Sequence, residues 1–170
     1  MSQANDHPAA CSPEQLLAEC EVRRLRRSGP GGQHRNKVET AISLHHIPTG
    51  ARAEASERRS QAQNRSAAMF RLRVNLALEV RCRCGSDYVP STLWRLRCAG
   101  RLNVSASHDD FPALLAEALD VLAALDADPK RSAARLSCTP SQLVRLLKLD
   151  PRALLLVNQW RKRRRLHALH

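Results

Sequence analysis

Alternating apolar and polar positions identify a β-hairpin in the first half of the chain. Residues 40–46, TAISLHH, alternate strictly, and residues 51–57, ARAEASE, alternate again with alanine on one face. A period of two is typical of a half-buried strand. The IPTG sequence between these segments contains the proline and glycine that tight turns favour, so we expect the two strands to pair.

Two helices are expected to flank this hairpin. Residues 12–29 open with Ser-Pro-x-Gln, a capping box with proline at the first helical position, and this predicts a helix that ends at Gly29. Residues 60–82 repeat apolar side chains at helical spacing from Met69 to Val80, which predicts a long helix.

The second half of the chain has the pattern of a helical module. Residues 109–128 are apolar nearly all round, with Glu117 and Asp120 as a narrow polar stripe, as expected for a helix buried on several sides. Three short helices should follow, because three capping side chains each precede a proline. These pairs are Asp128-Pro129, Thr139-Pro140 and Asp150-Pro151.

The first two of these short helices resemble a helix-turn-helix. A tight turn at Ser137-Cys138 separates them, and Gln142, Arg145 and Lys148 are expected to face outward on the second helix. A plain helical bundle has the same apolar spacing, so both interpretations stay open at this point.

These elements predict an α+β fold, in which a small domain of a β-hairpin packed with a long helix precedes an all-α, helix-turn-helix-like module. We expect a disordered lead at 1–11, the α+β domain at 12–88, a connector at 89–108, the helical module at 109–160 and a basic tail at 161–170.

The charge of the chain favours a polyanionic partner. Lys and Arg number 28 against 16 acids, for a formal charge of +12, and a pI near 10.7 follows. Nucleic acid is the first expectation and an acidic membrane surface the weaker one. The sequence contains neither a run long enough to span a bilayer nor a recognisable targeting pattern, so we expect a cytoplasmic monomer without a membrane partner.

The six cysteines are expected to be reduced thiols, as is usual in the cytoplasm. Cys82, Cys84 and Cys98 form a C-x-C…C cluster without a fourth ligand beside it, and zinc sites usually offer two C-x₂₋₄-C pairs or two histidines. We therefore expect no metal and no cofactor, with zinc at this cluster as the alternative.

Residues 28–37, SGPGGQHRNK, combine three glycines and a proline with a glutamine and nearby cations. No Lys-Ser or Lys-Thr follows the glycines, which excludes a P-loop, and their spacing does not fit G-x-G-x-x-G. The segment before them also has a helical pattern. The remaining interpretation is a bare backbone that approaches a substrate closely, with an N–H group and one amide as working parts.

Residues 22–84 closely resemble the GGQ catalytic domain of class I peptide chain release factors and of the stand-alone GGQ proteins that rescue stalled ribosomes. The loop SGPGGQHRNK, the turn HIPTG and the segment ERRSQAQNR occur in the same order. The resemblance implies hydrolysis of the peptidyl-tRNA ester in the ribosomal peptidyl-transferase centre, with Gly31, Gly32 and Gln33 as the catalytic tripeptide.

The resemblance also implies a role for each member of the tripeptide. The backbone N–H of Gln33 would stabilise the oxyanion that forms when water attacks the ester. The two glycines would let the backbone enter a crowded RNA cavity, and the Gln33 side chain would shape the pocket for water. His34 could be considered a general base, but we favour RNA contact. Phosphate contacts are expected from Arg35, Lys37, Arg58, Arg59 and Arg65. RNA contacts are also expected from His34 and from Arg161, Lys162, Arg163, Arg164 and Arg165.

Codon recognition is not expected. Only 27 residues precede the glycine loop, and Pro90-Ser91-Thr92 matches a stop-reading Pro-x-Thr only superficially, outside any decoding domain. The chain is thus similar to codon-independent rescue members, whose basic C-terminal tail enters the mRNA channel. Its expected partners are the ribosome with its rRNA and peptidyl-tRNA. The alternatives are a non-catalytic RNA- or DNA-binding protein and a transcriptional regulator built on the helical module.

Overall fold

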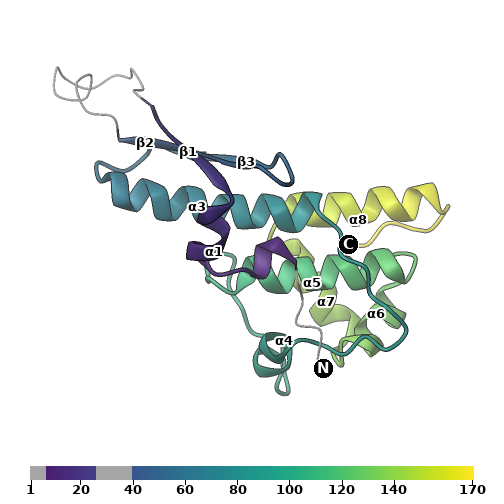
Figure 1. Cartoon of the computed structure of the whole chain (residues 1–170). Coiled ribbons are helices and arrows are strands. Elements are labelled where there is room, and N and C mark those ends of the chain that lie inside the picture. Colours follow the sequence, from purple (N-terminus) through teal and green to yellow (C-terminus); the bar gives the residue numbers. More distant parts are fainter. Residues whose placement is uncertain (1–6, 26–39) are drawn as a thin grey trace. The chain divides into compact units, whose positions relative to one another are not determined.

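The computed structural model describes residues 7–25 and 40–170 of the chain, and all structural statements below concern these residues (Figure 1). The chain divides into two compact units. One comprises Cys11–Leu76, and the other comprises Met1–Ala10 with Ala77–His170. The division falls within the long helix α3 (Gln61–Glu79), so this helix belongs to both units.

The first unit contains a three-stranded antiparallel sheet in the order β1-β2-β3. Strands β2 (Ala41–His46) and β3 (Arg52–Ala55) form the predicted hairpin, which is confirmed. Gly50 adopts φ +75°, the left-handed conformation that its turn requires, and its N–H donates to the His46 carbonyl at 2.8 Å. The prediction of an α+β fold with a following helical module is also confirmed.

The predicted helix over residues 12–29 is wrong from residue 19 to residue 25, and its last four residues, 26–29, lie outside the described residues. The capping box at Ser12 forms as expected, but helix α1 ends after six residues (Pro13–Ala18). Strand β1 (Cys20–Leu25) follows, and all six of its residues pair with β2. Pairing with a distant strand outweighs local helix propensity here, as tertiary context commonly does.

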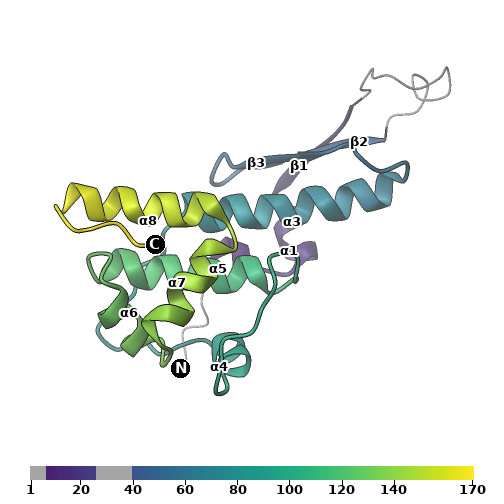
Figure 2. The same ribbon diagram turned by 180° about the vertical axis from the view of Figure 1, so that it is seen from behind.

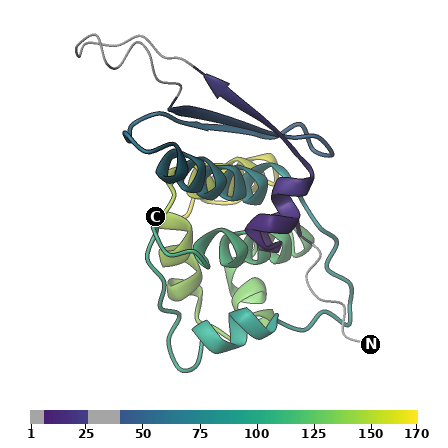
Figure 3. The ribbon, with the colours of Figure 1, turned by 60° about the vertical axis from the view of Figure 1, so that its left-hand side comes forward.

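Helix α3 lies along one face of this sheet, as Figure 3 shows. The predicted long helix is thereby confirmed. The alanines of β3 that alternate with exposed Arg52 and Glu54 are buried, and their small side chains permit a close approach of the sheet. Two α3 side chains satisfy β3 carbonyls: Arg71 donates to Glu54 at 2.7 Å and Asn75 to Arg52 at 2.8 Å.

The second unit is helical and centres on helix α5 (Phe111–Ala124), which is buried from Phe111 to Leu122. The three short capped helices are confirmed as α6 (Pro129–Arg135), α7 (Pro140–Lys148) and α8 (Pro151–Arg163). Helix α4 (Thr92–Arg97) lies within the predicted connector, and its buried Trp94 donates to the Leu136 carbonyl at 2.8 Å. None of the described helices has the length and apolar character needed to cross a bilayer.

The two acids of α5 are buried rather than forming a solvated stripe. Glu117 accepts hydrogen bonds from the Tyr88 hydroxyl and, at 2.7 Å, from the Ser91 N–H. Asp120 pairs with Arg81 at 3.2 Å and accepts the Cys82 N–H at 3.0 Å. Both carboxylates therefore fasten the 80–91 segment to the central helix.

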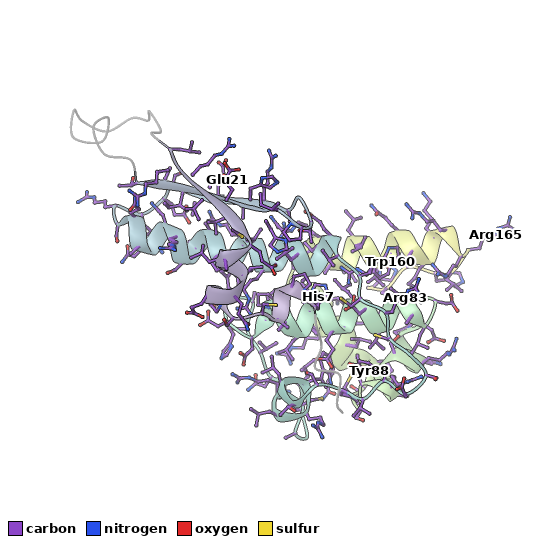
Figure 4. All side chains as sticks on the ribbon, in the orientation of Figure 1. His7, Glu21, Arg83, Tyr88, Trp160 and Arg165 are labelled. Carbon is purple, nitrogen blue, oxygen red and sulfur yellow. The ribbon has the colours of Figure 1, made fainter. Side chains whose placement is uncertain are left out.

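The expectation of disorder for residues 1–11 is wrong from residue 7 onward. Residues Pro8–Ala10 form a 3-10 helix, η1, which packs on α5, and His7 is fully buried (Figure 4). The Ala9 N–H donates to His7 Nδ1 at 3.0 Å, so Nε2 carries the proton and donates to the Val80 carbonyl at 3.2 Å. The neutral imidazole is the form that fits this site.

We predict that this histidine makes the helical unit acid-sensitive. Burial lowers the pKa of His7 from 6.5 to about 4, and neighbouring Arg81 adds to this. The unfolded chain therefore binds a proton more readily than the folded chain, and stability falls as the pH drops from 6.5 towards 4. From pH 7.5 to pH 4.5 this contribution is about 2–3 kcal/mol in the free energy of unfolding.

The neighbouring acid opposes this trend, so the measurement compares two variants. Burial raises the pKa of Asp120 to about 6, and its protonation favours the folded state as the pH falls from about 6 towards 4. Urea unfolding at pH 7.5 and pH 4.5 should show a smaller acid loss in His7→Asn and a larger one in Asp120→Asn than in the parent. The same acid loss in parent and His7→Asn would contradict the assignment.

Candidate catalytic and RNA-binding site

The segment that carries the glutamine tripeptide connects two paired strands. Strand β1 ends at Leu25 and β2 begins at Ala41, and these two residues are partners in the antiparallel register. Residues Gly31, Gly32, Gln33, His34, Arg35 and Lys37 lie outside the described residues. The structure therefore defines where their segment leaves and rejoins the sheet.

The position of this segment between strands bears on its chemistry. Dinucleotide-binding glycines lie between a strand and a helix, whereas these glycines lie between strands β1 and β2. The helix that we expected before the glycines was one reason to exclude that class, and this reason is wrong. The exclusion stands on the glycine spacing.

Asn64 fastens the chain immediately after this segment, and our sequence analysis did not single it out. Its Nδ2 group donates to the carbonyls of Thr40 at 2.6 Å and Arg58 at 2.9 Å, and its Oδ1 accepts the Arg58 N–H at 2.9 Å. The side chain is fully buried. A signal was available, because Asn64 precedes buried Ala68 and Leu72 at helical spacing and so falls on the apolar face.

The same network holds the backbone of Arg58, one of the first set of predicted RNA contacts. Arg58 and Arg59 lie in the loop between β3 and α3, and Arg65 lies in the first turns of α3. All three residues are exposed, and none forms an ion pair with another described residue. Their charges are available to solvent, which is what a phosphate contact requires.

The second predicted set of RNA contacts, Arg161 to Arg165, belongs to the other compact unit. Arg161 to Arg163 complete α8 instead of beginning a tail. Arg161 Nη1 donates to the Ala127 carbonyl at 2.6 Å, and Arg164 pairs with Asp126 at 3.2 Å. Figure 4 shows Arg165 at the far end of α8.

The helix-turn-helix pattern corresponds to α6, a turn and α7. The turn contains Ser137 at φ 55°, a left-handed position. Arg145 and Lys148 are exposed on α7, as predicted. Gln142 is half-buried, and its side chain completes a capping box with Thr139, so its amide is used within the helix.

The Pro-x-Thr triplet contributes a side chain to the fold. Ser91, within Pro90-Ser91-Thr92, caps α4 and donates its hydroxyl to Glu117 at 2.6 Å.

All six cysteines are free thiols. Cys82 lies near His7 and Asp120, with one ligand atom of each within 4.8 Å of the others, and Cys84 and Cys98 are not part of this group.

That group does not present a ready metal site. Both His7 nitrogens are hydrogen-bonded to backbone groups, and the Arg81 guanidinium forms an ion pair with the Asp120 carboxylate. A metal ion would have to displace a backbone hydrogen bond and tolerate the guanidinium. Burial raises the pKa of Cys84 to about 11, so that thiol is also poorly prepared to bind metal as a thiolate.

A comparison with known protein families finds a match that covers most of the first unit and the residues just after it. Residues 16–83 match the model of the RF-1 domain. The matched range contains the tripeptide, the sheet, Asn64 and the exposed arginines of α3 and its preceding loop. Residues 16–83 of this chain are therefore similar to the GGQ-containing domain of class I release factors.

Proposed function

We propose that this protein hydrolyses the ester of peptidyl-tRNA on the ribosome without reading a codon, and that it acts on stalled ribosomes in the cytoplasm. The observation that carries the proposal is the position of Gly31-Gly32-Gln33. This tripeptide lies inside the RF-1 match, in the connection between the paired ends of β1 and β2. A binding module alone has no need for an intact tripeptide in this place.

The chemistry proposed for the site requires few protein groups. The Gln33 N–H stabilises the developing oxyanion, Gly31 and Gly32 allow the backbone to approach the ester, and the Gln33 side chain admits water. No side chain is assigned as general base, and His34 contacts RNA. Arg35, Lys37, Arg58, Arg59 and Arg65 contact phosphates around the site, which positions the domain without reading sequence.

Codon independence is supported by the contacts and charges of the helical unit. Ser91 of the Pro-x-Thr triplet is engaged with Glu117 and the N-terminus of α4, so its polar groups serve the fold. The cations of α7 and α8 are suited to phosphate, which is common to all RNA sequences. We infer that binding depends on RNA shape and charge.

We predict equal hydrolysis whichever codon occupies the ribosomal A site. The measurement is release of labelled peptide from ribosomes programmed with a stop codon, with a sense codon, or with an mRNA that ends at the P site. Rates on the stop and sense codons should agree within about twofold, since the energetic difference between cognate and non-cognate codons is expected to be below about 0.5 kcal/mol.

Two outcomes would contradict this proposal in different ways. A strong preference for one stop codon would refute codon independence and return attention to Pro90-Ser91-Thr92. An absence of release on all three templates, with ribosome binding intact, would favour the alternative of a non-catalytic RNA-binding protein. Faster release on the truncated message than on both longer ones would support action on stalled ribosomes.

A further inference from the structure

The positive charge of the chain is concentrated in its last three helices and the segment after them. Residues 129–170 contain eleven of the 28 Lys and Arg residues but a single acid, Asp150, of the 16. This stretch therefore accounts for +10 of the formal charge of +12. Residues 1–128, which include the RF-1 domain, are close to neutral by the same count.

Part of this charge is used to fold the C-terminal segment back along α8. Arg161 donates to the Ala127 carbonyl from Nη1 and to the His167 carbonyl from Nε, both at 2.6 Å. Asn158 exchanges two hydrogen bonds with the Leu169 backbone, at 2.7 and 3.1 Å. Figure 2 shows the chain turning back beside α8 towards its C-terminus.

Two arginines of α8 and the segment after it bind the turn before α6. Asp126 and Ala127 both have left-handed φ angles, of 59° and 56°. Arg164 pairs with the Asp126 carboxylate at 3.2 Å, and Arg161 binds the Ala127 carbonyl. Arg161 and Arg164 thus tie α8 and the C-terminal segment to the α5–α6 turn, and their charges serve the fold.

Four other cationic side chains of α7 and α8 do not hold the fold in this way. Arg145 and Lys148 are exposed one turn apart on α7, and Lys162 and Arg163 are exposed at the end of α8. None of these four side chains donates a hydrogen bond or forms an ion pair with another residue in ranges 7–25 and 40–170.

The exposed side of α8 has the character of a contact surface. Arg152, Leu155, Gln159, Lys162 and Arg163 fall within one arc of the helix, and all five are exposed. Leu155 is 59% exposed, which is high for an apolar side chain. Neither α7 nor α8 contains an acid, and the aromatic residue of α8, Trp160, is half-buried with Arg81 over its ring at 5.8 Å.

We propose that the helical module binds the phosphate backbone of double-helical RNA with a preformed surface, through Arg145 and Lys148 of α7 and Lys162 and Arg163 of α8. The surface is folded, since Arg161, Arg164 and Asn158 hold the C-terminal segment against α8. It presents cations but no aromatic platform, and stacking on aromatics is how single strands are usually held. Phosphate contacts alone do not distinguish RNA from DNA, and the choice of RNA rests on the proposed ribosomal function.

The test measures binding of the full-length protein to a fluorescent 20-base-pair RNA duplex over a range of salt concentrations. The quadruple variant Arg145→Gln, Lys148→Gln, Lys162→Gln, Arg163→Gln keeps residues that favour helix. Between 50 and 200 mM salt, the parent should lose about 100-fold more affinity than this variant, because four phosphate contacts contribute about that factor.

Control variants separate this surface from general charge and from a free tail. Arg95→Gln with Arg101→Gln removes exposed cations outside α6–α8 and should leave affinity within about twofold. Truncation after residue 163 should cost far less affinity than the quadruple variant. A truncation that costs as much as the quadruple variant would overturn the folded-surface proposal in favour of an extended tail.

Further arms identify the ligand and separate this inference from hydrolysis. A DNA duplex of the same sequence bound as tightly as the RNA would overturn the choice of RNA. Equal salt dependence in the parent and the quadruple variant would overturn the surface itself, whatever the release rate. Gly32→Ala should keep the RNA affinity of the parent, so a failed release assay with intact, surface-dependent RNA binding would count against the hydrolase and leave this inference standing.

Discussion

Replacing Gly32 with alanine should reduce peptide release by about 100-fold or more while ribosome binding stays within about twofold of the parent. Loss of a single oxyanion donor costs about this factor in well-studied hydrolases. A Cβ at this position restricts the backbone angles and crowds the approach of the Gln33 N–H to the ester. The proposed RNA contacts, in contrast, are spread over cations of both units, and the substitution removes none of them.

The measurement is single-turnover release from purified ribosomes that carry labelled peptidyl-tRNA, with binding followed by co-sedimentation at low salt. Thermal unfolding of the variant should match that of the parent and serves as the folding control. Release at the parental rate would remove the tripeptide from the mechanism. Lost release together with lost binding would show that the substitution acts on affinity, which would contradict the separation proposed here.

Replacing Asn64 with alanine should lower the free energy of unfolding by roughly 3 kcal/mol or more and should slow release in the fraction that remains folded. Three hydrogen bonds disappear, and the Arg58 N–H and the carbonyls of Thr40 and Arg58 lose the partner that the fully buried Asn64 side chain supplies. The Thr40 carbonyl is released as well, and Thr40 directly precedes β2 at the end of the segment that carries the tripeptide.

Asn75 provides a matched control on the same helix. Its Nδ2 also donates to a backbone carbonyl of the sheet, that of Arg52 at 2.8 Å, but at a partly exposed site where water can replace it. Asn75→Ala should cost less than about 1 kcal/mol and leave release unchanged. Chemical denaturation of both variants tests the comparison, and equal small losses would show that the Asn64 network does not order this region.

Much of the secondary structure could be predicted because its determinants are local. The capping pairs Asp128-Pro129, Thr139-Pro140 and Asp150-Pro151 act within three residues, and each begins a helix in the structure. The alternation in residues 40–46 and 51–57 similarly specifies which side chains face the core. The RF-1 resemblance was equally readable, because it lies in short contiguous motifs within residues 16–83.

The misassigned elements depend on partners far along the chain. The Ser12 capping box forms, yet residues 20–25 pair with β2, and no pattern inside those six residues indicates their partner. Trp94 is buried because its indole reaches Leu136, 42 residues away. Residues 8–10 are ordered because η1 packs on α5 and His7 is held by the Val80 carbonyl. Composition suggested a lead and a connector because neither segment carries its own periodicity.

The sequence by itself indicated the class of chemistry and a polyanionic partner, and it determined the order of most helices and strands, since spacing, capping and charge are properties of neighbouring residues. Only the tertiary structure decided what each polar group is for. It engages Asn64 with Thr40 and Arg58, and it commits Arg161 and Arg164 to a turn at residues 126–127, while Arg145, Lys148, Lys162 and Arg163 face solvent. An arginine whose guanidinium donates to a carbonyl and an arginine whose guanidinium is exposed to solvent have the same letter in the sequence. Burial and hydrogen-bond geometry distinguish them.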